Sequence, residues 1–124
     1  MEKKSSLNNK LSKFLEYVLG DVLAEVSGIR SRAMFGGYGL YRNGVIFGII
    51  AESRLYFKVG ETNQADYEAR GMGPFTYATP KGKKYAMSYF QVPEEVMEDR
   101  EEIERWVVKA VGASLEAKGK KSKK

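Results

Sequence analysis

The sequence predicts a single α+β domain in which helices pack on an antiparallel sheet. The expected order is helix, three or four strands, helix, two strands, helix. Near both ends of the chain, apolar residues recur at spacings of three and four, which indicates amphipathic helices. Between these ends the apolar spacing falls to two, in short runs separated by turn residues, as is typical of antiparallel strands. The 124 residues leave room for one domain, expected over residues 1–117.

The first helix is predicted over residues 7–26. Ser6 suits the N-cap position, because its hydroxyl can accept a hydrogen bond from a free backbone N–H of the first turn. Gly20 weakens the helix interior by about 1 kcal/mol, which favours a division there, and Gly28 is expected to end the helix. The apolar positions with helical spacing are Leu7, Leu11, Phe14, Leu15, Val18, Val22 and Val26.

Four strands are expected next, over residues 29–35, 38–42, 45–51 and 55–59. Asn43-Gly44 predicts a type I′ hairpin, because both residues tolerate the positive φ that this turn requires. Glu52-Ser53 is expected to form a second turn. Strict alternation then places one set of side chains on a helix-packed face: Gly39, Tyr41, Ile46, Gly48, Ile50, Leu55, Phe57 and Val59. The other face receives Tyr38, Leu40, Phe47, Ile49, Tyr56 and Lys58.

The second half of the chain predicts a short helix over residues 62–70, two strands and a final helix. The strands, over residues 75–77 and 83–92, flank a turn at Pro80-Lys81-Gly82. Pro93 suits the first position of a helical turn. Asp99 and Glu102 resemble a capping box for the last helix, which is expected to end near Ala117.

The net charge of +5 originates at the end of the chain. Residues 1–117 are formally neutral, because the excess comes from Lys118, Lys120, Lys121, Lys123 and Lys124. The segment 118–124 has nothing apolar to bury and is expected to be a disordered, lysine-rich tail. Such a tail either keeps the protein dissolved or makes a weak contact with a polyanion such as nucleic acid.

The chain contains neither histidine nor cysteine. This composition excludes Ser-His-Asp and Cys-His nucleophilic systems, thiol redox chemistry and nearly every structural zinc site. The acidic residues gather between Glu94 and Glu104, where helix capping and solvation account for them. A divalent-metal or acid/base site is the alternative interpretation of this cluster. We therefore expect no enzyme activity, no catalytic residue, no metal and no cofactor.

The compartment is predicted from what the sequence lacks. No apolar stretch approaches the ~20 residues of a membrane-spanning helix, and no apolar run follows the lysines of residues 1–10 as in a secretory signal. The absence of cysteine fits a reducing compartment. We expect a cytoplasmic protein that makes no membrane contact.

The second predicted sheet face mixes aromatic rings with basic side chains. On an antiparallel sheet such a face is a contact surface, or else an ordinary covered or solvated face, or a surface for a ligand or nucleic acid. We predict contact with a protein partner or with another copy of the chain. The predicted interaction residues are Tyr38, Leu40, Arg42, Phe47, Ile49, Tyr56 and Lys58.

The glycine cluster at residues 35–39 raises the alternative of an anion or small-ligand pocket. Its candidate residues are Arg30, Arg32, Gly36 and Gly37. A phosphate loop needs a helix N-terminus after the glycines, whereas a strand is predicted there. A bulge or sharp bend between strands therefore explains the glycines with fewer assumptions.

A third candidate surface combines lysine and tyrosine in the last predicted strand. Lys83, Lys84, Tyr85 and Tyr89 are the residue types of a nucleic-acid stacking surface. Alternation, however, places Tyr85, Met87 and Tyr89 on one face and Lys84 on the other. Core packing with extended lysines is the alternative interpretation.

Four segments of the chain resemble the TfoX N-terminal domain family. They are SRAMFGGYGLY at residues 31–41, RLYFKV at 54–59, GPFTY at 73–77 and MSYFQVPEEV at 87–96, within a resemblance that runs from about Leu11 to Val111. The resemblance implies an α+β fold like that of the secretion chaperones. It also implies kinship with TfoX/Sxy regulators, which help to switch on DNA-uptake genes alongside a cyclic-AMP-dependent activator. Those regulators carry a second, C-terminal helical domain, which this chain is expected to lack.

Overall fold

The computed structural model describes residues 2–34 and 36–122, with side chains described for residues 10–34 and 36–119. Phe35, predicted to end the first strand and begin the glycine cluster, and residues 123–124 of the predicted tail lie outside this range. The elements in chain order are α1 (Glu2–Tyr17), a short π-helix η1 (Val18–Val22), β1 (Ile29–Met34), β2 (Gly37–Arg42), β3 (Val45–Ala51), β4 (Arg54–Lys58), α2 (Gln64–Glu68), β5 (Pro74–Ala78), β6 (Lys84–Gln91), α3 (Glu94–Met97) and α4 (Arg100–Ser122).

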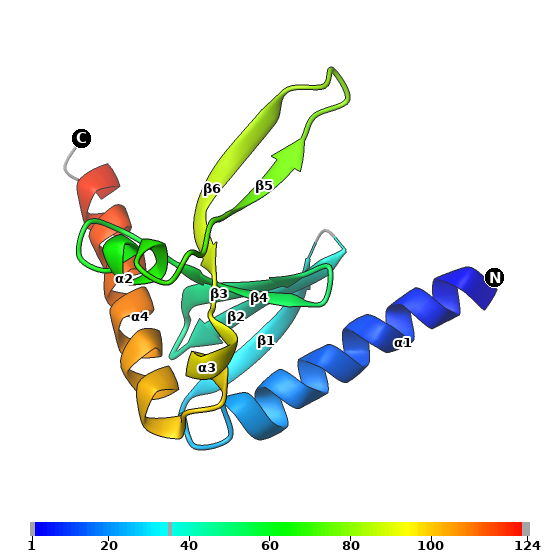
Figure 1. Cartoon of the computed structure of the whole chain (residues 1–124), viewed down its shortest axis with the longest axis horizontal. Helices are drawn as coiled ribbons and strands as arrows, with labels where there is room; N and C mark the ends of the chain where they lie inside the picture. The colour runs from blue at the N-terminus through cyan, green and yellow to red at the C-terminus, as the bar shows by residue number, and fades with distance from the viewer. Residues whose placement is uncertain (1, 35, 123–124) are drawn as a thin grey trace.

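The six strands form one antiparallel sheet in the order β1-β2-β3-β4-β6-β5. This sheet and its helices confirm the predicted α+β class. Figure 1 shows the β5–β6 hairpin rising away from the other four strands, while α1 extends from the lower part of the molecule to the right, away from α4. The hairpin joins the sheet through β6, where Phe57 of β4 pairs with Phe90. The β5–β6 hairpin therefore forms an arm that projects from a broader body of four strands.

Several boundaries differ from the predicted ones. The first helix is divided near Gly20, as predicted: α1 ends at Tyr17, and the π-helix η1 that follows contains this glycine. The last helix continues to Ser122, past the predicted end near Ala117. Lysine favours helical backbone, so the lysine-rich segment after Ala117 can extend the helix without burying apolar surface.

Helices and sheet enclose the main core on one face of the sheet. Val18 and Val22 of η1 and Ile103 and Val107 of α4 are almost fully buried there. They pack in one cluster with strand residues of the same face, which are Leu40, Phe47, Ile50, Leu55, Phe57 and Phe90. The amphipathic spacing in the terminal helices thus reflects burial against the sheet.

The β2–β3 hairpin closes as predicted but contains a bulge. Asn43 has φ 50° and Gly44 φ 84°, as a type I′ turn requires. Beyond the turn the register shifts, so that Leu40 pairs with Gly48. The extra residue on β3 interrupts the alternation of side chains. Phe47 therefore enters the main core together with Ile50.

The predicted division of these strands into two faces is therefore wrong. Leu40 and Phe47, predicted on the contact face, are fully buried in the main core. Ile46, predicted to pack beneath the helices, lies with Ile49 on the opposite face. The physical reason is the bulge, since one added residue reverses the orientation of every side chain on one side of it.

Tyr67 of α2 is a buried tyrosine whose hydroxyl has no hydrogen-bond partner among the described residues. Its ring packs edge-on against Trp106, with the ring centroids 4.5 Å apart, and against Phe90 at 6.0 Å. Burial, with a smaller contribution from the negative charge of Asp66, raises the pKa of Tyr67 far above its ordinary value. The phenol therefore stays neutral in the folded protein, at the cost of an unsatisfied hydroxyl.

We expect Tyr67→Phe to stabilise the domain by about 1 kcal/mol at pH 7, because it removes an unpaired buried hydroxyl. In the variant, the free energy of unfolding should also decrease less steeply as the pH rises above ~10. Above pH ~10 the phenol ionises in the unfolded chain but stays neutral when folded, so each further pH unit costs about 1.4 kcal/mol. Thermal melts of both proteins between pH 7 and 11 measure this, and an unchanged slope in the variant would contradict the assignment.

Candidate functional site

The face of the sheet opposite the main core has a smaller apolar cluster of its own. We call it the open face. Ile49, Tyr56 and Tyr89 are buried there by neighbouring strand residues, and Ile46, Ala51 and Phe75 pack around them. Ile49 pairs with Tyr56 across β3 and β4, and the Tyr56 and Phe75 rings meet edge-on, with their centroids 5.1 Å apart. Strand pairing and ring packing therefore give this face a fixed floor.

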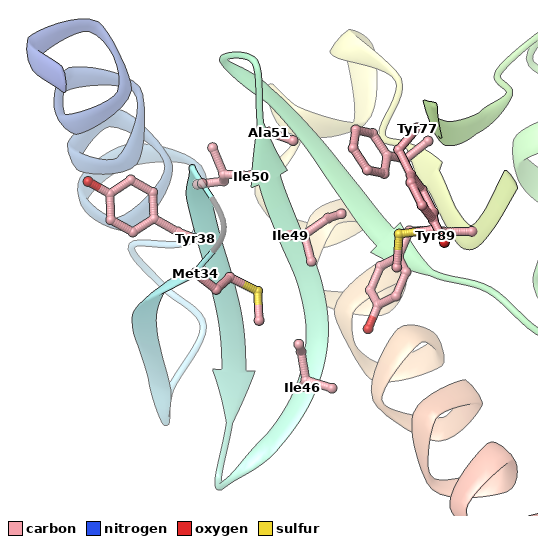
Figure 2. Close-up of a pocket in the computed structure, with 11 residues that line it drawn as sticks. Met34, Tyr38, Ile46, Ile49, Ile50, Ala51, Tyr77 and Tyr89 are labelled. Carbon is pink, nitrogen blue, oxygen red and sulfur yellow. The ribbon is translucent and has the colours of Figure 1, made fainter. Parts of the chain in front are cut away.

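A groove of about 530 Å³ lies on the open face, between the broad part of the sheet and the β5–β6 hairpin. Figure 2 shows Met34, Ile46 and Ile49 on one side of it and Tyr77 and Tyr89 on the other. Nearly all the lining groups are apolar, and the full set is Met34, Gly37, Tyr38, Ile46, Ile49, Ile50, Ala51, Phe75, Tyr77, Met87 and Tyr89. The groove can therefore bury an apolar surface but has few groups that would orient a polar ligand.

The β5–β6 hairpin, which forms one wall of the groove, exposes large apolar side chains in and beside that wall. Tyr77 is 47% exposed, Tyr85 46% and Met87 37%. Tyr77 pairs with Tyr85 across the two strands, and their ring centroids are 5.7 Å apart. Clustered apolar side chains of this size in contact with water are typical of interaction surfaces.

The charges on the sheet have one sign. The six strands contain six basic residues and no acidic residue: Arg30, Arg32, Arg42, Arg54, Lys58 and Lys84. Arg30, Arg32 and Met34 alternate along β1, so the two arginines share the groove side with Met34. The Nζ of Lys58 lies 5.3 Å from the centre of the Tyr89 ring. The groove and the charges around it are therefore complementary to apolar and acidic groups.

Tyr89 adds no charge to the groove. Burial, and to a smaller extent Tyr41, raises the pKa of Tyr89 above its ordinary value. Its phenol is therefore neutral at physiological pH and contributes ring surface rather than a reactive phenolate.

The structure separates the predicted interaction residues. Ile49, Tyr56 and Lys58 lie on the open face, whereas Leu40 and Phe47 are core residues and cannot form a surface. Tyr38 packs against the main core and also reaches one end of the groove. Arg42 donates a hydrogen bond of 3.5 Å to the hydroxyl of Ser27.

Sequence reasoning missed Met34, Ile46, Phe75, Tyr77 and Met87 as groove residues. One signal was present, because Tyr85, Met87 and Tyr89 alternate onto one side of the last strand. The sequence did not show that this side of the last strand faces the same groove as Ile46 and Ile49 of the β2–β3 hairpin.

The predicted anion site is not assembled as one pocket. A hollow beside Gly36 and Gly37 is lined by neither Arg30 nor Arg32. Gly36 has φ 78°, and a Cβ at Gly37 would collide with the carbonyl oxygen of Ile50. A tight turn and a close backbone approach therefore account for these glycines, as the structural alternative proposed.

The predicted nucleic-acid residues are also divided. Lys84 and Tyr85 are adjacent in β6 and so project to opposite sides, and Tyr89 is buried in the groove floor. Lys83 precedes the strand. The lysines and rings do not form one basic stacking surface.

The part of the chain that the structure describes contains neither a metal-ligand cluster nor a membrane-spanning helix. No cluster of three or more acidic side chains within residues 10–34 and 36–119 has the arrangement of a metal site. Within residues 2–34 and 36–122, no helix combines the length and apolar character needed to cross a membrane.

Comparison with known proteins identifies the family. A family model described as the TfoX N-terminal domain matches residues 21–114, which include all six strands and the core part of α4. No curated protein matches the chain. The family match covers most of the chain and agrees with the segments that resembled the family in the sequence. The chain therefore belongs to the TfoX N-terminal domain family.

Proposed function

We propose that this domain is a non-enzymatic interaction module that binds an amphipathic helix of a partner protein in the groove of the open face. The observation that carries the proposal is an apolar groove on a sheet whose strands contain only basic charges. The apolar face of a sheet is ordinarily buried against another layer of secondary structure. A partner helix would supply that cover with apolar residues at positions i, i+3, i+4 and i+7.

The charge of the partner follows from the same surface. Arg30 and Arg32 at one edge, with Arg54 and Lys58 on the neighbouring part of the sheet, would meet the flanks of a bound helix. Acidic flanks would be attracted over a Debye length of about 8 Å at physiological salt, which increases the association rate and selects against basic helices. The proposed partner segment is therefore apolar on one face and acidic beside it.

The side chains of the groove support a binding role, which needs no reactive group. Imidazole and thiol groups are absent from the sequence. The phenol of Tyr89, which lies in the groove floor, is kept protonated by burial. The groove is therefore suited to holding apolar surface rather than to transferring protons.

Family membership supports a regulatory setting for this contact. We propose that the domain acts in the cytoplasm, in control of DNA-uptake competence, by contacting another protein. The contact itself rests on the groove, so it can be tested without knowing the pathway.

Labelled synthetic helices of 18 residues test the groove. Each carries leucines at i, i+3, i+4 and i+7, with either glutamate or lysine on the flanks. We expect the glutamate form to bind at least roughly tenfold more tightly by fluorescence anisotropy, a difference of about 1.4 kcal/mol. Met87→Glu should abolish this binding, because it places a carboxylate on the groove wall.

Val108→Glu is the matched control, because Val108 is an exposed apolar residue on α4 rather than in the groove. It should leave peptide binding unchanged. Equal binding of the two peptides, or equal loss in the two variants, would contradict the proposal.

Single-stranded nucleic acid is a second candidate, favoured by the exposed Tyr77–Tyr85 ring pair, on which bases could stack, and by the five lysines of residues 118–124. On this alternative, removing residues 118–124 should weaken retention on single-stranded DNA and reduce its dependence on salt. The full chain passing through a DNA column at low salt would eliminate it.

A further inference from the structure

The solvent side of α4 carries apolar surface that the groove does not explain. Val108 is 54% exposed and Leu115 50%. Seven residues are close to two helical turns, so both side chains lie on one side of the helix, about 10 Å apart along its axis. Gly112 lies between them and is partly exposed. We call Val108, Gly112 and Leu115 the α4 outer face.

Nothing within the described chain requires glycine at position 112. Its φ is not in the left-handed region, and no atom outside the local helix lies within 4 Å of the place where a Cβ would be. Glycine destabilises a helix interior relative to alanine. The open space therefore has no packing role within one molecule, but it permits the close approach of another helix between two apolar contacts.

The charge distribution along the end of the chain gives that second helix a direction. Residues 94–105 contain seven acidic side chains and two arginines, whereas residues 118–124 contain five lysines. Two copies of α4 in parallel would bring like charges together at both ends. An antiparallel pair would instead place each basic end beside the acidic start of the other copy.

We propose that a second copy of this chain packs antiparallel on the α4 outer face and forms a two-fold symmetric dimer. The symmetry axis passes close to Gly112, so that Val108 of each copy contacts Leu115 of the other. Such an interface is self-complementary and closed. A 23-residue helix is about 35 Å long, so a single helix pair is a small interface. We therefore expect weak dimerisation, with an affinity that decreases as salt screens the charges at the helix ends.

Cysteine cross-linking tests the direction of packing, because the chain has no cysteine of its own. Val108→Cys and Leu115→Cys are prepared as separate full-length proteins and oxidised alone and as a mixture. The mixture should form a mixed disulfide dimer at least several-fold faster than either protein alone. If either variant alone cross-links as fast as the mixture, the antiparallel arrangement is overturned.

Sedimentation at low salt tests the dimer itself. The wild-type chain should dimerise with concentration, Leu115→Glu should remain monomeric, and Met87→Glu, which alters only the groove, should dimerise normally. Gly112→Ala should raise the melting temperature of the dilute monomer while weakening the dimer roughly tenfold. A wild-type chain that stays monomeric at millimolar concentration, or dimerisation lost in Met87→Glu but kept in Leu115→Glu, would refute the proposal.

Discussion

Phe47→Glu should unfold the domain, whereas Ile46→Glu, one residue earlier, should leave it folded. Phe47 is fully buried in the main core, where its ring meets that of Phe57 edge-on, with the centroids 5.4 Å apart. Losing such a ring costs about 3–5 kcal/mol, and an unpaired buried carboxylate adds several more. This total approaches or exceeds the usual stability of a domain, about 5–15 kcal/mol. Ile46 borders the open groove, where a carboxylate remains hydrated.

Circular dichroism and urea unfolding distinguish these two variants. Ile46→Glu should cost roughly 1 kcal/mol, within the ordinary range for a partly exposed site. It should nevertheless lose the glutamate-flanked peptide, because it alters the groove. A folded Phe47→Glu protein beside an unfolded Ile46→Glu protein would mean that the bulge is absent and that the two faces are exchanged.

Gly37→Ala should be the most damaging single methyl group that can be added to the sheet. The new Cβ would collide with the carbonyl oxygen of Ile50, a backbone atom in the neighbouring strand. A backbone cannot rotate away as a flexible side chain can, so β2 and β3 must move apart. We expect a loss of about 3 kcal/mol, at the upper end of the usual cost of overpacking.

Gly73→Ala is the control for this substitution. The position of its Cβ is open and its φ is not left-handed, so the change should be neutral or slightly stabilising. Urea denaturation of both variants measures the difference. Equal stability of the two proteins would show that the strands tolerate the collision, and that Gly37 is not needed for close pairing.

Local sequence signals predicted the turns and element types well. Asn43-Gly44 identified its hairpin because few residue pairs tolerate two consecutive positive φ angles. The apolar spacing in α4 identified a helix with one buried side, which the burial of Ile103 and Val107 confirms. These features depend on neighbours within a few residues, and such short-range preferences are contained in the sequence.

The assignment of residues to faces failed at one residue. Alternation determines a face only while the register is regular, and the bulge in β3 ends that regularity. Gly48 was the available signal, since glycine inside a strand often marks a bulge. A Cβ there would come within 2.9 Å of the Tyr56 carbonyl oxygen and 3.1 Å of the Phe57 ring. The position of Phe47 was therefore decided by packing against β4.

By itself, the sequence determined that this is an α+β domain of the TfoX N-terminal type, without imidazole or thiol chemistry. Only the tertiary structure decided where the groove lies, because its walls come from hairpins that are distant in the chain. Met34 and Ile46 meet Tyr77 and Met87 only after β6 has paired with β4. Such pairing is selected by burial of apolar area across the whole molecule, a quantity that no local pattern contains.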